Sequence, residues 1–210
     1  MPIGRWVLAE ACQQARRWQR ETRLTDFAIS VNTSARELAE PRFVAEVVGT
    51  LATTGLAPEH LTLEVTESVL LADETAAVVT LRALRAAGVH IAVDDFGTGY
   101  SSLSYLDRLP VDGLKIDRSF VQGLAPGRGK SALVSATLGF ARALGLTVTA
   151  EGVETDEQLR KLQELRCRQA QGFYLSRPLS TESLVELLAS GRSYSTPPSP
   201  HRVLRSRSAS

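Results

Sequence analysis

The chain has 210 residues, of which 43% are hydrophobic and 22% are charged, so a mostly disordered or fibrous protein is excluded. Its net charge is +1, but residues 191–210 hold four arginines and no acid, which leaves 20 basic and 23 acidic residues in 1–190. Nucleic-acid-binding domains are usually basic, so we expect no specific nucleic-acid binding by this acidic body.

Short apolar strands alternate with amphipathic helices along the chain. A first helix is predicted over residues 4–20, with Ile3, Trp6, Val7 and Trp18 as its apolar face. Strands are expected over 27–32, 61–65, 90–94, 113–116, 146–150 and 169–175, and further helices over 41–54, 74–87, 130–144 and 155–165. Repeated strand–helix units predict an α/β fold with a parallel sheet.

The composition changes near the C-terminal end. Residues 191–210 are rich in Pro, Ser and Arg and are expected to form a disordered tail, next to a domain over 1–190. Cys12 and Cys167 predict free thiols in a reducing compartment. Glu10 interrupts any signal peptide, and no run approaches 18 apolar residues, so we expect a cytoplasmic protein without a membrane span.

Polar residues stand at the ends of the predicted strands. In strand geometry Thr62 and Glu64 share one face, while Leu61, Leu63 and Val65 share the other. Because the carboxyl ends of parallel strands meet at one edge, we expect a shared site there. Its members are Asn32, Glu64, Glu67, Asp94, Asp95, Lys115, Asp117, Glu151, Glu154 and Gln171. The alternative is that the acids are helix caps or solvated loop residues.

The predicted cluster holds seven carboxylates and one lysine. Such a set cannot stay fully ionised without cations or bound protons. Carboxylate oxygens with the Asn32 amide suit Mg²⁺ or Mn²⁺, and two such ions would support attack of water on phosphorus. The cluster therefore predicts metal-dependent phosphoester hydrolysis, although enolate chemistry on a barrel would use similar groups.

The segment 94–102 reads DDFGTGYSS. Gly97 and Gly99 permit backbone conformations that other residues avoid, so the segment is predicted to be a mobile lid or a coupling loop beside the cluster.

Six segments of the chain stand out as a set: VNTSAR at 31–36, LEVTESVL at 63–70, DDFGTGYSSLSYL at 94–106, LKIDRSFV at 114–121, AEGVET at 150–155 and QGFYLSRPL at 171–179. Together they resemble the EAL family of bacterial cyclic di-GMP phosphodiesterases. The resemblance covers residues 2–189 and implies a TIM-like barrel that hydrolyses cyclic di-GMP to linear pGpG with two Mg²⁺ or Mn²⁺ ions.

The resemblance also implies roles for the clustered residues. By motif, Asn32, Glu64, Asp94 and Asp95 would bind metal. The other catalytic residues would be Lys115, which would hold the attacking water, Asp117, which would belong to the same metal and water shell, and Glu151, a general base or metal ligand. Supporting residues would be Glu67, which anchors the loop that contains Gly97 and Gly99, Glu154 within the site, and Gln171 at its edge.

One family feature is absent from the sequence. The Glu-Ala-Leu motif, which supplies a further metal ligand, does not occur, and six strands are predicted where a closed barrel has eight. We therefore expect an incomplete barrel that lacks an N-terminal part, with activity in doubt. The alternative function is a non-catalytic nucleotide sensor or protein-interaction module. The family also implies a homodimer and an upstream sensor or GGDEF-type domain.

Overall fold

The computed structural model describes residues 2–72, 74–97, 106–124 and 131–190. The chain divides into two units, Met1–Pro178 and Leu179–Ser210. The first unit is built around a parallel sheet of six strands, with the order β1-β2-β3-β4-β5-β6. The strands are β1 (Ile29–Asn32), β2 (Leu61–Thr66), β3 (His90–Phe96), β4 (Gly113–Ile116), β5 (Thr147–Ala150) and β6 (Gln169–Ala170).

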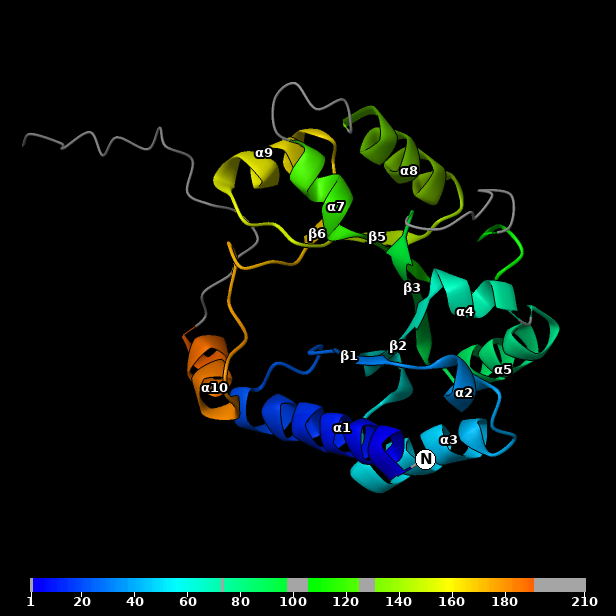
Figure 1. Ribbon diagram of the computed structural model, residues 1–210. Coiled ribbons are helices and arrows are strands. Elements are labelled where there is room, and N and C mark those ends of the chain that lie inside the picture. The colour runs from blue at the N-terminus through cyan, green and yellow to red at the C-terminus, as the bar shows by residue number, and fades with distance from the viewer. Residues whose placement is uncertain (1, 73, 98–105, 125–130, 191–210) are drawn as a thin grey trace, which may run out of the picture. The chain divides into compact units, whose positions relative to one another are not determined.

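Helices follow the strands and cover the outside of the curled sheet (Figure 1). The longer ones are α1 (Pro2–Thr22), α3 (Phe43–Thr54), α5 (Glu74–Ala86), α8 (Ser131–Ala143) and α9 (Asp156–Glu164). The short ones are α2 (Ala35–Leu38), η1 (Pro58–His60), α4 (Glu67–Ala72), α7 (Arg118–Val121) and η2 (Gln122–Leu124). This arrangement confirms the predicted incomplete TIM-like barrel, with six parallel strands among the described residues.

The helix ends follow from local sequence. Gly55 ends α3 in the left-handed conformation, with φ of 71°, which glycine adopts without strain. Thr155 begins α9: its side chain accepts a hydrogen bond from the Gln158 N–H at 3.2 Å. The Gln158 side chain in turn accepts from the Thr155 N–H at 3.1 Å. This reciprocal cap fixes the start of the helix that follows β5.

The main core lies between the outer face of the sheet and the helices. Leu61, Leu63 and Val65 of β2 are almost fully buried, as are Ile91 and Val93 of β3. These are the strand positions predicted to be apolar. The opposite positions carry the polar residues, so the strands present one apolar and one polar face.

The predicted apolar face of α1 is wrong at three of its four positions. Ile3, Trp6 and Val7 are exposed, and only Trp18 is buried. The face that packs against the sheet and α3 consists of Leu8, Cys12, Ala15, Trp18 and Gln19. Cys12, Ala15 and Gln19 are less hydrophobic than Trp6 and Val7 near the helix start. The hydrophobicity pattern therefore predicted the wrong face.

The last strand is much shorter than predicted. Residues 169–175 were expected to be extended, but β6 ends at Ala170. The chain then turns, because the N–H groups of Leu175 and Ser176 both donate to the Gly172 carbonyl. Gly172 lies so close to the backbone of Val153 that a side chain would not fit.

The second unit contains α10 (Thr181–Ala189), which begins at the N-cap Ser180. The predicted tail, 191–210, and Gly99 of the DDFGTG segment lie outside the described residues. Among the helices that are described, none has the length and apolar character needed to cross a membrane. Neither Cys12 nor Cys167 is in a disulfide.

Candidate functional site

A bulge in β3 brings two consecutive acids to the site. Alternation along a regular strand would send Asp94 and Asp95 to opposite faces of the sheet. Between Val93 and Phe96 the register of β3 with β4 shifts by one residue, which marks a β-bulge. Asp95 takes a positive φ of 55°, and its N–H donates to the Asp94 carboxylate at 3.0 Å. The bulge therefore allows both carboxylates to lie near the end of β5.

Lys115 of β4 stands at the centre of the cluster. Its Nζ lies 2.5 Å from Glu64 Oε2, 2.7 Å from Glu151 Oε1 and 3.3 Å from Asp94 Oδ1. The lysine and Glu64 are buried. Four strand ends, those of β2, β3, β4 and β5, thus contribute one charged group each to a single ion-pair network.

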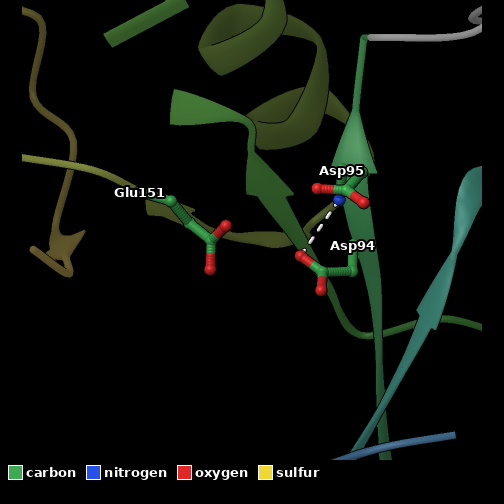
Figure 2. A group of neighbouring side chains, drawn as sticks. All are labelled: Asp94, Asp95 and Glu151. Carbon is green, nitrogen blue, oxygen red and sulfur yellow. Dashed lines mark hydrogen bonds between the residues drawn. The ribbon is translucent and has the colours of Figure 1, made fainter. Parts of the chain in front are cut away.

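The carboxylates of Asp94, Asp95 and Glu151 form the most compact acidic group in the described part of the chain. One oxygen from each lies within 4.8 Å of the others. Figure 2 shows that the side chains of Asp94 and Glu151 extend toward one another from β3 and from the end of β5, with Asp95 beside Asp94. Three oxygens at this separation could bind one divalent cation.

The pKa values reflect an excess of negative charge. Burial lowers the pKa of Lys115 on its own, but hydrogen bonds to Glu151 and Glu64 outweigh it and hold the pKa well above its usual value. Burial raises the pKa of Glu151, although Lys115 partly offsets this. Burial, followed by the charges of Asp94 and Asp117, also raises the pKa of Asp95. One ammonium is thus surrounded by more carboxylates than it can neutralise.

This excess charge provides a test of whether the site fits a metal. Glu64, Asp94, Asp95 and Glu151 supply oxygen ligands only, and hard divalent cations prefer oxygen. A further cation would also relieve the repulsion between carboxylates that adds to burial in raising the pKa of Asp95 and Glu151. The residues present fit a divalent cation on both grounds.

The site opens onto a cavity of about 570 Å³ along the inner face of the sheet. Its lining is rich in polar residues, which include Ser30, Thr62, Glu64, Lys115, Thr147, Thr149, Gln169 and Gln171. The polar face predicted from strand alternation therefore does point inward.

Glu67 and Phe120 lie against Gly97 of the DDFGTG segment, residues 94–99. Glu67 is buried at the start of α4, and its Oε2 accepts a hydrogen bond from the Gly97 N–H at 3.0 Å. Gly97 has φ of 98°, and a side chain there would come within 2.9 Å of the Phe120 ring. The sequence reasoning missed Phe120. Its only signal was its place four residues after the end of β4, as a bulky apolar residue next to Val121.

Asp117 is engaged as a helix cap. Its Oδ1 accepts a hydrogen bond from the Ser119 N–H at 2.9 Å at the start of α7. Burial would raise its pKa, but the hydrogen bonds from Ser119 and Arg118 outweigh this and lower it. Asp117 is near enough to raise the pKa of Asp95, so it adds negative charge to the site while it caps a helix.

Three predicted residues lie at the rim with exposed side chains. Asn32 ends β1, and its backbone is in register with Glu64 of β2. Glu154 precedes α9, where its N–H donates to the Gln158 side chain. Gln171 follows β6, and its N–H donates to the Ala150 carbonyl at 2.8 Å. The structure thus brings Glu64, Asp94, Asp95, Lys115 and Glu151 together and places these three at the edges of the same strand ends.

Comparison with known proteins tests the resemblance to the EAL family. Residues 1–178 match the EAL domain. The bifunctional diguanylate cyclase/cyclic di-GMP phosphodiesterase MucR of Pseudomonas aeruginosa is 48% identical over 187 residues, which are 89% of this chain and 27% of MucR. The chain thus spans less than a third of such full-length relatives.

Solved structures agree with this match. The MucR phosphodiesterase in complex with c-di-GMP superimposes with a TM-score of 0.83 over 87% of this chain and 74% of that one. The EAL domain of Mycobacterium smegmatis DcpA, 43% identical, gives 0.85 over 90% and 85%. A manganese/cy-diGMP complex of Klebsiella pneumoniae BlrP1, 34% identical, gives 0.79 over 86% and 45%. The motifs, the fold and these matches agree, and the chain belongs to the EAL domain family.

Proposed function

We propose that this chain is the catalytic module of a phosphodiesterase that hydrolyses cyclic di-GMP to linear pGpG with two Mg²⁺ or Mn²⁺ ions. The observation that carries the proposal is the network around Lys115 of β4, which gathers carboxylates from three other strand ends at 2.5–3.3 Å. The c-di-GMP complexes of MucR and BlrP1, and the manganese in the latter, support the choice of ligand and metal.

The metal ligands would be Glu64, Asp94 and Asp95, with Asn32 at the rim. Bound Mg²⁺ or Mn²⁺ would offset the charge of the substrate phosphate and acidify a water molecule. Without such cations, an acidic cluster of this kind would repel a phosphodiester. Metal removal is therefore expected to abolish both binding and turnover.

The chain's own residues would orient the nucleophile. Lys115 donates to Glu64 and Glu151 at once, so it fixes the positions of both carboxylates. Glu151 would accept the proton of the attacking water as the new O–P bond forms. The P–O3′ bond would then break and the 3′ oxygen would take up a proton, which leaves a linear product with a 5′-phosphate. The ammonium of Lys115 would also hydrogen-bond the water.

The test is to incubate the purified chain with cyclic di-GMP and Mn²⁺ or Mg²⁺ and to separate the products by chromatography. We expect pGpG from the wild type and at least a 100-fold lower rate from Glu64→Gln and Glu151→Gln. Glu157→Gln, on the exposed surface of α9, is the matched control and should keep full activity. Tight binding without any product would instead support the non-catalytic sensor.

The remaining expectations concern the longer protein. We propose that the chain acts in the cytoplasm as a homodimer, downstream of a sensor or GGDEF-type domain. Size-exclusion chromatography with light scattering would test the dimer, and a mass that stays monomeric at high micromolar concentration would contradict it.

A further inference from the structure

A second groove lies at the opposite end of β5 from the acid cluster. It has a volume of about 540 Å³ and is lined by Arg142 of α8, by Arg166 and Arg168 in the segment between α9 and β6, and by Leu146 and Val148. Figure 1 shows α8 and α9 near β5 and β6, where these residues are located. Thr147 and Glu151 are four positions apart on an extended chain, a distance of about 13 Å, so the groove lies away from the acid cluster. Thr147 and Gln169 line both the groove and the inner cavity.

All the charged residues that line this groove are arginines. Arg142, Arg166 and Arg168 are all exposed, and no carboxylate in the described ranges lies within ion-pair distance of any of them. Arg142 donates its Nε to the Leu138 carbonyl at 3.1 Å, which fixes the guanidinium and leaves its terminal amino groups available. The charge of Arg142 also acts on the Cys167 thiol, between the other two arginines, although burial raises the pKa of that thiol overall.

Arg166 occupies a backbone position that favours glycine. The N–H of Arg166 donates to the Gln163 carbonyl and the N–H of Cys167 to the Leu162 carbonyl, which is the hydrogen-bond pattern of a Schellman motif at the end of α9. Arg166 takes the left-handed conformation required there, with φ of 59°. The turn itself does not need the long charged side chain of Arg166, and glycine would avoid the strain. The arginine therefore indicates a role beyond the turn.

The groove suits a small molecule that combines a phosphate with an apolar part. Guanidinium groups bind phosphate oxygens through paired hydrogen bonds, and three of them can satisfy a doubly charged group. Leu138 and Val148 are buried in the floor, and Leu146 is half-buried. An aromatic base could pack on this floor or against a guanidinium plane. The volume also lies within the range of small-ligand sites.

We propose that Arg142, Arg166 and Arg168 form a binding site for a nucleoside phosphate, distinct from the acid cluster and independent of metal. The apolar floor takes the base and the arginines take the phosphates. This site does not depend on the function proposed for the acid cluster, because no residue lines both the groove and the ion-pair network around Lys115.

The experiment titrates the chain with ADP in EDTA, by isothermal titration calorimetry, so that binding through metal in the acid cluster is removed. We expect ADP to bind, adenosine not to bind, and inorganic phosphate to bind at least tenfold more weakly than ADP. Arg142→Gln, Arg166→Gly and Arg168→Gln should each weaken ADP binding about tenfold, as expected for the loss of a charged hydrogen bond. Arg82→Gln on α5, an exposed arginine outside the groove, is the matched control.

Arg166→Gly separates binding from folding. Glycine takes the left-handed conformation without strain, so this variant should have a melting temperature equal to or above that of the wild type while it binds ADP more weakly. Glu64→Gln should bind ADP like the wild type. The proposal is overturned if the three arginine variants bind as the wild type does, if Glu64→Gln loses binding, or if phosphate binds as tightly as ADP.

Discussion

The charged groups at the two ends of the sheet are balanced differently. At the carboxyl end, Lys115 is shared by Glu64, Asp94 and Glu151, so acids outnumber the base. At the amino end, the Asp112 carboxylate accepts hydrogen bonds from Arg85 at 2.7 and 3.1 Å and from the Ile91 N–H at 2.9 Å. His90 lies 3.7 Å from the same carboxylate.

Both ends line the same inner cavity, but Lys115 and Glu64 are more deeply buried than Arg85 and Asp112. The amino-end network is electrically balanced and joins β3, β4 and β5, since the Asp112 carbonyl also accepts from the Thr147 N–H at 3.0 Å. The carboxyl-end network retains an unbalanced negative charge that folding alone would not favour. Balanced charge indicates a structural role and unbalanced charge a binding role, and this contrast can be tested by mutation.

The largest effect should come from Lys115→Met. Removal of the Lys115 ammonium leaves buried carboxylates unpaired, which typically lowers the free energy of unfolding by about 3–5 kcal/mol. Urea unfolding without metal would measure it. Mn²⁺ should restore part of the lost stability. Acidic pH should restore another part, because the clustered carboxylates of the folded variant then bind more protons than those of the unfolded chain.

Lys161→Met provides the control for this loss. Lys161 pairs with Glu164 on the exposed face of α9, and such pairs are worth at most about 1 kcal/mol. A Lys115→Met protein as stable as Lys161→Met in the absence of metal would contradict the idea that the acid cluster is unbalanced.

Gly97→Ala should have the next largest effect. The residue has φ of 98°, and its new Cβ would press on the Phe120 ring, so we expect a loss of about 1–3 kcal/mol. Turnover should fall as well, because Glu67 could no longer hold this part of the segment. Gly139→Ala in α8 is the control, since space surrounds that position and alanine favours the helix. Equal stabilities of the two variants would argue against strain at Gly97.

Asp112→Asn tests the balanced end. The amide keeps the shape but loses the charge that binds Arg85, so the free energy of unfolding should fall by about 1–2 kcal/mol. Since Arg85 is partly exposed, the ion pair itself contributes only a part of this loss. Neither the rate of cyclic di-GMP hydrolysis nor the affinity for Mn²⁺ should change. A drop in Mn²⁺ affinity would show that the two ends are coupled.

The smallest effect is expected from Arg166→Gly at the end of α9. Relief of the left-handed arginine should stabilise the protein by about 0.5–1 kcal/mol, measured by urea unfolding. Arg168→Gln, two residues away, should leave stability within about 0.5 kcal/mol of the wild type. Destabilisation by Arg166→Gly would mean that the arginine contributes packing that the conformational argument omits.

Much of this fold is encoded in local patterns, which explains why six strands and the long helices could be predicted. Polar residues at the ends of successive strands also sufficed to predict that Glu64, Asp94, Lys115 and Glu151 would meet, because parallel strands bring their carboxyl ends together.

Features that depend on contacts between distant segments could not be predicted from local sequence patterns. Strand alternation offers no reason for Asp95 to join Asp94, since that depends on a bulge set by the pairing of β3 with β4. The inward face of α1 depends on how Cys12 and Ala15 fit against α3, which a hydrophobicity pattern does not capture. The pairing of Phe120 with Gly97 is likewise a contact between distant segments.

The bulge in β3 makes the spacing of the chain as important to this site as its residue types. One extra residue between Val93 and Phe96 places two neighbouring carboxylates on the same side of the sheet. Deletion of a single residue there would restore regular pairing and turn one of the two acids toward the helices, even if every charged residue were kept. The acidic cluster therefore depends on the number of residues in this stretch as well as on their identity.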